Sequence, residues 1–295
     1  MDEKEFRERM VAVDKELALK GIPAALRSFH AYFSISGAKS MRGHTNFDPS
    51  LGLYEGTNLF LSIDEWYVAT YPRRVISARD FGARPVLIRS ELFLMQIPAA
   101  PNANPETMSA MKYIEGICGS LVQILDQNEK DDIQARFNLY FREGSRLALL
   151  GVRTKEFSGP NAPLAAALIA HGLADLHSVS RSILQSQPSA HLWSAQQAVE
   201  KLLKAYLSLC DPAMNVAKLK RTFGHNLSFL LKECAKHCAA FQQASQDIAR
   251  VNINPEERYQ GAVVAVGDVL AAIDTAYAIC DLTARVIFAM LKERR

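Results

Sequence analysis

The chain has 295 residues, which is enough for two domains of ordinary size or for one large helical domain. Hydrophobic residues make up 49% of the chain and charged residues 22%, which is the balance of a soluble globular protein. The net charge is +3, with 18 Lys and Arg against 19 Asp and Glu in residues 1–150 and 16 against 12 in the remainder. This asymmetry is compatible with a polyanionic partner for the second half, but it is too small to establish one.

Three features bear on the compartment of the protein. The first ten residues are charged and lack an apolar core, so we expect no signal peptide. No run of eighteen apolar residues occurs, so we expect no membrane span and no membrane partner. The cysteines are odd in number, and most lie in apolar helical patterns: Cys118, Cys210, Cys234, Cys238 and Cys280. Reduced thiols in a cytoplasmic protein fit this pattern better than a disulfide framework.

The N-terminal half reads as helices around a small hairpin. Apolar periodicity predicts helices over residues 2–20, 23–33 and from Thr57 to near Tyr71, with a loop over residues 36–50. Two short apolar runs, residues 85–88 and 92–97, predict a β-hairpin. Because two strands cannot stand alone in water, the hairpin must lie on helices or pair with another chain.

Two further helices precede a predicted domain boundary. Asn104-Pro105-Glu106 has the order of an N-cap, a first-turn proline and an early acid, and predicts a helix to about Gln127. A second helix is predicted from Asp131 to Leu150. The polar stretch 153–163 then indicates a boundary. We therefore expect an α-rich domain with the hairpin over residues 1–152 and a second domain over residues 160–295.

The second domain is predicted to be a helical bundle. Helices are expected at about 163–185, 189–210, 225–243 and 256–293, and Gly261 and Gly267 could bend or divide the last one. Four or five antiparallel helices with short connections form an up-and-down bundle. The expected fold class of the whole chain is therefore mainly α with one small hairpin.

Three segments of this half resemble the HEPN family, a helical domain named for higher-eukaryote and prokaryote nucleotide-binding proteins. Residues 196–205 (QQAVEKLLKA) are similar to its second helix, and Gly224-His225-Asn226-Leu227 is similar to a later helix start. Residues 255–259 (PEERY) are similar to the Arg-Tyr start of its last helix. The resemblance implies a bundle over residues 160–295, a homodimer, and recognition of a nucleotide or RNA, in a bacterial defence or toxin–antitoxin setting.

Many members of that family are ribonucleases, and the resemblance makes Arg221 and His225 the candidate catalytic residues. Nucleolytic members carry Arg, four to six intervening residues, and then His. Here only three residues separate Arg221 from His225, and lysines stand at positions 218 and 220. Lysine lacks the planar fork of donors that grips a phosphate bidentately. This departure favours a non-catalytic binding module over a metal-independent ribonuclease with altered spacing.

The first candidate binding site comprises a basic connector and the helix start after it. A helix N-terminus presents unpaired N–H groups that favour phosphate, and cations lie just upstream of this one. The bland alternative is that Asn226 or His225 simply caps the helix while the cations solvate a loop. The candidate ligand-binding residues are Lys218, Lys220, Arg221, His225 and Asn226.

The second candidate is a polar stripe beside the apolar face of the 189–210 helix. It could form part of a ligand cleft, but we favour an interhelical network that fixes the register of the second and last helices. Its members are Gln197, Glu200, Lys201 and Lys204, joined by Arg258 and Tyr259 from the start of the last helix.

Two weaker candidates remain. Cys234, His237 and Cys238 could share a helix face, but three ligands without a fourth do not make a structural zinc site, and we expect no metal. Five arginines near the hairpin could track a nucleic-acid backbone, form a solvated face, or pair with the acidic first helix: Arg73, Arg74, Arg79, Arg84 and Arg89, interleaved with Tyr67, Tyr71 and Phe81. No phosphate loop, dinucleotide fingerprint or nucleophile elbow appears, so no cofactor is expected.

A third functional hypothesis is a purely structural dimerisation module. In that case the specificity, and any partner protein, would belong to residues 1–150.

Overall fold

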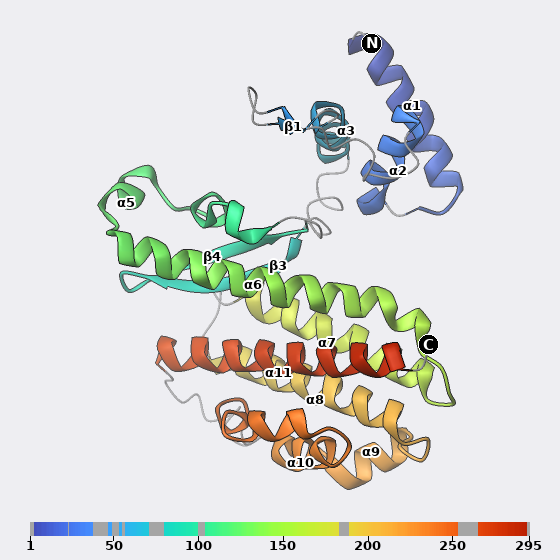
Figure 1. Cartoon of the computed structure of the whole chain (residues 1–295), viewed down its shortest axis with the longest axis vertical. Helices are drawn as coiled ribbons and strands as arrows, with labels where there is room; N and C mark the ends of the chain where they lie inside the picture. The colour runs from blue at the N-terminus through green and yellow to red at the C-terminus, as the bar shows by residue number, and fades with distance from the viewer. Residues whose placement is uncertain are drawn as a thin grey trace. The chain divides into compact units, whose positions relative to one another are not determined.

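The computed structural model describes residues 3–22, 24–37, 47–48, 53–54, 57–70, 80–99, 104–182, 189–252 and 265–293. The chain divides into two compact units, Met1–Asp80 and Phe81–Arg295, which are described separately. The fold is mainly helical, as predicted from the sequence (Figure 1).

The first unit is built on three helices. They are α1 (Glu3–Leu19), α2 (Ala24–Ser36) and α3 (Thr57–Thr70), accompanied by the two-residue antiparallel strands β1 (Phe47–Asp48) and β2 (Leu53–Tyr54). Its core contains Met10, Leu17, Tyr32, Ile63 and Tyr67. The three helices confirm the periodicity of the sequence, whereas β1 lies in a stretch that was expected to be loop.

The second unit begins with the predicted hairpin, β3 (Asp80–Ile88) and β4 (Glu91–Pro98). The turn residues Arg89 and Ser90 both have positive φ, of 49° and 68°, as two-residue hairpin turns require. One face of the hairpin is buried in a hydrophobic cluster that includes Phe137 of the helix at residues 127–153. The buried hairpin residues are Val86, Ile88, Met95 and Ile97. The hairpin therefore lies on a helix rather than standing alone.

The helix expected between Asn104 and Gln127 is not formed. The segment instead holds short pieces: η2 (Pro105–Thr107), η3 (Ala110–Tyr113) and α5 (Gly119–Ile124). Asn104 does cap the first of them, by accepting a hydrogen bond from the Glu106 amide. The helix cannot continue because Ile114 forms a β-bridge with Met95 and Gly116 has a φ of 73°.

The next helix is α6 (Gln127–Arg153), which begins four residues before the predicted start. Asp126 and Glu129 form a reciprocal capping box, and this sets the start of the helix.

The boundary expected at residues 153–163 lies inside the second unit. Its polar residues bond within the fold: η4 (Thr154–Glu156) continues α6, and the Asn161 amide donates to the Pro212 carbonyl at 3.0 Å. The prediction of domains 1–152 and 160–295 is corrected accordingly, because α6 packs on the bundle.

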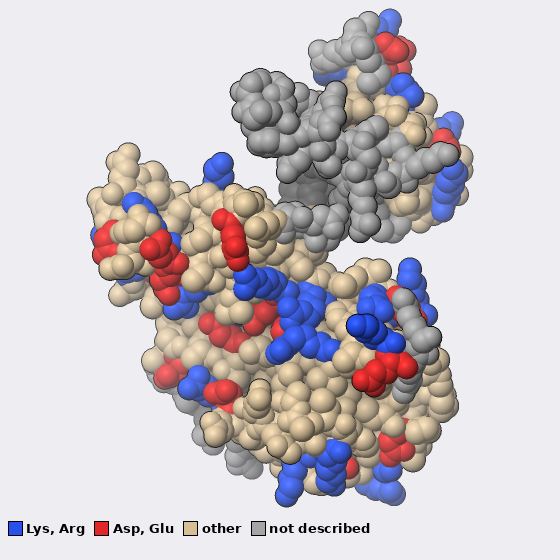
Figure 2. All heavy atoms as spheres, in the orientation of Figure 1, with Lys and Arg blue, Asp and Glu red and all other residues tan. Residues whose placement is uncertain are grey.

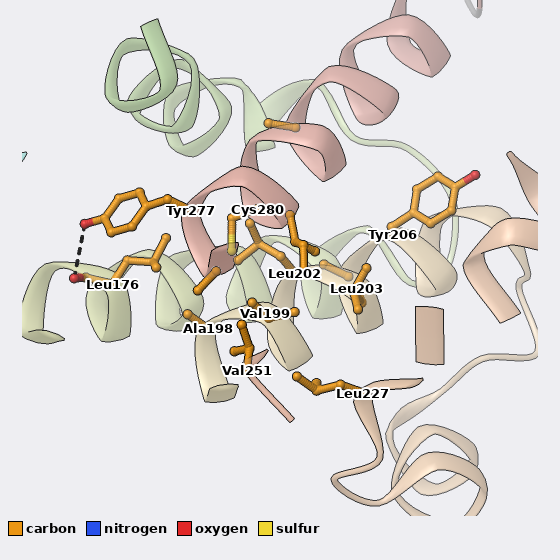
Figure 3. Packing of buried hydrophobic residues seen from close by; sticks show 14 of the residues in the cluster. Leu176, Ala198, Val199, Leu202, Leu203, Tyr206, Leu227, Val251, Tyr277 and Cys280 are labelled. Atoms are coloured by element: carbon orange, nitrogen blue, oxygen red, sulfur yellow. Dashed lines mark hydrogen bonds between the residues drawn. The ribbon is translucent and has the colours of Figure 1, made fainter. Parts of the chain in front are cut away.

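The bundle surrounds α8 (Ser189–Cys210), which contacts α7 (Ala162–Ser182), α10 (Leu227–His237) and α11 (Val266–Glu293). Figure 3 shows Val199 and Leu202 of α8 packed beside Cys280 of α11, while the Tyr277 hydroxyl donates to the Leu176 carbonyl at 3.3 Å. Ala198, Val199, Leu202 and Leu203 of α8 are all fully buried. The apolar face read from the sequence is thus the centre of the core.

Two details of the bundle differ from the prediction. The basic connector is helix α9 (Val216–Phe223), and α10 ends at His237 rather than near residue 243. The short helices η5 (Ala239–Ser245) and η6 (Ile248–Arg250) follow it. The last helix is described from Val266, with Gly267 in its first turn, and Gly261 lies outside the described residues.

One described segment, residues 162–179 of α7, has the length and composition of a membrane span. Core helices of globular proteins can have the same length and composition, and α7 packs against α8 in the bundle. We therefore interpret α7 as a bundle helix.

Gly172 sets the close approach of α7 to α8. A Cβ there would lie 2.4 Å from Leu202 Cδ1 and 3.2 Å from the Ala198 carbonyl oxygen. We expect Gly172→Ala to lower the free energy of unfolding by roughly 1–2 kcal/mol, because overpacking outweighs the gain in helix propensity. Gly267→Ala is the control, since a Cβ there meets nothing within 4 Å. Urea unfolding of both variants checks this, and equal stability would contradict it.

Candidate functional site

The cations of α9 fall into two groups. Asn215 caps α9, and the Lys218 ammonium lies 3.4 Å from the Asp211 carboxylate. Lys220 and Arg221 are exposed in the last turn of α9, and neither forms an ion pair within the part of the chain that the structure describes. They are therefore the cations that remain available to a ligand.

The turn between α9 and α10 is formed by Gly224, His225 and Asn226. Gly224 has a φ of 52°, a conformation that favours glycine. The Asn226 side chain accepts a hydrogen bond from the Phe229 amide at 3.0 Å and so caps α10. The capping role expected as the bland alternative is thus taken by Asn226, while His225 is directed elsewhere.

His225 contacts a buried carboxylate of α8. Its Nδ1 lies 2.9 Å from Glu200 Oε2, and its side chain is 55% exposed whereas that of Glu200 is 6% exposed. If Nδ1–H donates to the carboxylate, Nε2 is left as the acceptor on the exposed part of the ring. Histidines that act as general bases in enzymes are often oriented by a carboxylate in the same way.

The polar stripe of α8 holds this turn in place. The Lys204 ammonium donates to Glu200 Oε1 at 2.6 Å and to the Gly224 carbonyl at 2.8 Å. The Gln197 amide also donates to Glu200, at 3.2 Å. Gln197, Glu200 and Lys204 therefore form one network. This network contacts the Gly224 carbonyl through Lys204 and the His225 ring through Glu200. The expected partners Arg258 and Tyr259 lie outside the described residues.

Two further α8 side chains adjoin the network. Lys201 pairs with Asp175 of α7 rather than with Glu200. The rings of Trp193 and His225 lie 5.6 Å apart between centroids, at 57°. Sequence reasoning did not single out Trp193, although its position one turn before Gln197 was a signal that it shares a face with the stripe.

The cysteine cluster offers no support for a metal centre. Cys234 is buried and its thiol lies 3.8 Å from the Leu203 carbonyl oxygen. Burial raises the pKa of the Cys234 thiol well above its usual range. Among the residues that the structure describes, no group of three His, Cys, Asp or Glu side chains could hold a metal ion.

The described arginines of the hairpin are paired. Arg89 forms a bidentate contact with Glu129, at 2.8 and 2.9 Å, and these hydrogen bonds lower the pKa of Glu129 to about 2. Arg84 is buried against acids of α6 and α11. Arg73, Arg74 and Arg79 lie outside the described residues. Arg84 and Arg89 therefore do not provide free cations for a polyanion.

Arg84 is the centre of an ionic network that joins β3, α6 and α11. Its guanidinium lies 2.9 Å from Glu143 Oε2 and 2.6 Å from Asp274 Oδ1. The guanidinium carbon lies 4.0 Å and 3.6 Å from the ring centroids of Tyr140 and Tyr277. Burial raises the pKa of Glu143, and the charge of Arg84 only partly opposes this.

A cleft adjoins this network. It has a volume of about 970 Å³ and is lined by residues of α6, α11 and the 240–250 segment. Sequence reasoning missed both the network and the cleft, because their residues come from four separate segments of the chain.

The pKa of Glu143 gives a pH prediction with a defined sign. Because the folded state raises this pKa above its usual 4.5, the contribution of Glu143 to stability is complete below about pH 4.5 and is lost as the pH rises through the folded value. We expect the difference in free energy of unfolding between the wild type and Glu143→Gln to fall over this range.

Glu129→Gln should behave oppositely. Its pKa is lowered, so the contribution of Glu129 is present above pH 4.5 and is lost as the pH falls toward 2. Urea titrations between pH 2.5 and 7.5 test both signs, and parallel profiles would contradict the assignment.

A scan of family models, a search of the curated proteins and a search of the solved structures each found no significant match to this chain.

Proposed function

We propose that the surface around Lys220, Arg221 and His225 binds RNA or a nucleotide, and that the protein is a non-catalytic interaction module. The observation that carries the proposal is how the cations are used. Lys204 and Lys218 are held by acids of the fold, whereas Lys220 and Arg221 are exposed without an ion pair in the described residues. Free cations four and five residues before a fixed, exposed imidazole suit a phosphate.

The surroundings of this surface support the same conclusion. Residues 216–237 carry five Lys and Arg residues and one acid, Glu233. Figure 2 shows Lys and Arg side chains along the edge of the bundle where α9 and α10 lie. The neighbouring rings of Trp193 and His225 add an aromatic surface on which a base could stack.

The resemblance to the HEPN family supports this choice of ligand and adds two elements to the proposal. One is a homodimer, and the other is a role in bacterial defence or a toxin–antitoxin pair, with residues 1–150 contacting a partner protein. Both elements derive from the resemblance alone.

The contact between Glu200 and His225 favours a second candidate, a metal-independent endoribonuclease. An imidazole oriented by a buried carboxylate can accept the proton of a 2′-hydroxyl, and Arg221 would stabilise the charge that develops on the phosphate. The three-residue spacing between Arg221 and His225 speaks against it.

One experiment separates the candidates. Labelled single-stranded RNA is incubated with the protein in EDTA at several salt concentrations, beside the variants His225→Ala and Glu200→Gln. We expect bound but intact RNA, with an affinity that falls as salt rises. Cleavage that both variants abolish would establish the ribonuclease instead. If neither RNA nor nucleotides bind, both candidates fail and the structural dimerisation module remains.

A further inference from the structure

Phe229 is an exposed aromatic residue in the first turn of α10. It is 41% exposed, whereas every other Phe, Tyr and Trp residue whose burial the structure describes is less exposed. An aromatic ring gains free energy when a ligand covers it, because apolar surface is removed from water. The ring therefore offers a ligand a contact that no other described aromatic residue offers to the same extent.

The position of the Phe229 ring is fixed by its neighbours. The Phe229 amide donates to the Asn226 side chain at 3.0 Å. The ring of Phe229 lies 5.3 Å from the ring of Phe223, measured between centroids, at 50°. Phe223 is only 4% exposed, so it anchors the exposed ring to the core. This contact joins the end of α9 to the start of α10, and the two helices lie side by side in Figure 1.

Cations flank this pair of rings on both helices. Lys220 precedes Phe223 by three residues in α9, and Lys232 follows Phe229 by three residues in α10. Side chains three residues apart are neighbours on the surface of a helix. Both lysines are exposed, and neither forms an ion pair with another described residue. The Phe229 ring therefore lies between ammonium groups that the fold does not neutralise.

Lysines around an exposed ring fit a nucleic acid better than a protein partner. The centres of protein–protein interfaces are depleted in Lys. Proteins that bind single strands instead combine cations, which contact the phosphates, with aromatic rings on which the bases stack. A base offers its face to such a ring only when it is unpaired, because the bases of a double helix are stacked on one another.

We propose that Phe229 stacks on an unpaired base, so that this surface selects single-stranded RNA over duplex RNA. The inference rests on the proposed binding of RNA around Lys220, Arg221 and His225, and it adds the residue that distinguishes the two forms. Cations alone would favour the duplex, since a double helix carries two phosphate chains and the higher charge density. The Phe229 ring reverses that preference.

Fluorescence anisotropy with the full chain measures the preference. The probe is a short labelled RNA of mixed sequence, used as a single strand and annealed to its complement. We expect the single strand to bind at least about ten-fold more tightly than the duplex. Phe229→Ala should lower the affinity for the single strand about five-fold or more, with an unchanged salt dependence because no charge is lost.

Three further variants show that the aromatic face is what matters. Phe229→Leu keeps an apolar side chain against Phe223 and should weaken single-strand binding as Phe229→Ala does, in a protein with unchanged circular dichroism. Phe229→Tyr keeps the aromatic face and should bind like the wild type. Val216→Ala removes an exposed apolar side chain from α9 and should leave the affinities for both probes unchanged.

The outcomes separate this inference from the proposed function. If neither probe binds, both fail. If single strand and duplex bind equally tightly, or if Phe229→Leu binds like Phe229→Tyr, RNA binding stands and the role of Phe229 is overturned. Sedimentation velocity adds a second criterion. A change of oligomeric state in Phe229→Leu would place the ring in a contact between copies of the chain and would also overturn the proposal.

Discussion

Replacing Arg84 by methionine is expected to lower the free energy of unfolding by roughly 3–5 kcal/mol at neutral pH. The substitution leaves Glu143, whose side chain is 8% exposed, as a buried carboxylate without its cation. It also removes the guanidinium from between the rings of Tyr140 and Tyr277. Urea unfolding measures the loss.

Two matched variants serve as controls for Arg84→Met. Arg89→Met also removes an arginine from the hairpin, but the pair of Arg89 with Glu129 is exposed, so we expect a far smaller loss of stability than for Arg84→Met. Arg84→Met/Glu143→Leu replaces the buried pair by apolar side chains and should regain much of the loss, while Asp274 stays solvated. If Arg84→Met is tolerated as well as Arg89→Met, the network does not hold the hairpin to the bundle.

Local patterns were sufficient for most of the helices and for the hairpin, because their signals lie within a few residues. The apolar face of α8 is read directly from the spacing of Ala198, Leu202, Ala205 and Leu209, and these residues are buried. The same kind of reading failed after Asn104. The cap was identified correctly, but a β-bridge between Met95 and Ile114 competes with the helix, and that contact is tertiary.

The misplaced domain boundary has a similar cause. The stretch around Gly159-Pro160 is polar, and polar residues with Gly and Pro are typical of linkers. Its polarity instead serves the fold, since Asn161 binds carbonyls at the end of α8. Contacts such as Arg146–Asp281, between α6 and α11, then join residues that no local pattern connects.

The sequence identified both residues that are in contact at the candidate site, but it did not predict the contact itself. Glu200 and His225 were each identified, one in a structural stripe and the other in a basic connector. That they touch depends on α8 packing against the α9–α10 turn. The two residues are 25 positions apart in the sequence, and the segment between them carries no signal of this contact. Arg84 is the extreme case, because Glu143 and Asp274 lie 59 and 190 residues away.

Reversing the two free cations, in Lys220→Glu/Arg221→Glu, is expected to have the largest effect on the proposed function. Each cation that neutralises a phosphate of single-stranded RNA contributes about 0.7 to the slope of log affinity against log salt. Loss of both should reduce that slope by about 1.4, and repulsion by the new carboxylates should weaken binding at low salt by roughly a hundred-fold or more. Fluorescence anisotropy with a labelled oligonucleotide measures both quantities.

The control for net charge is Lys112→Glu/Lys130→Glu, which makes the same change in η3 and α6 of the same unit. If binding depended only on the overall charge of the protein, the two double variants would lose equal affinity, and the assignment of the site would fail. If the surface around His225 is the site, the control keeps its slope. His225→Ala, which removes the imidazole and its contact with Glu200, should then lower the affinity while Lys220 and Arg221 stay in place.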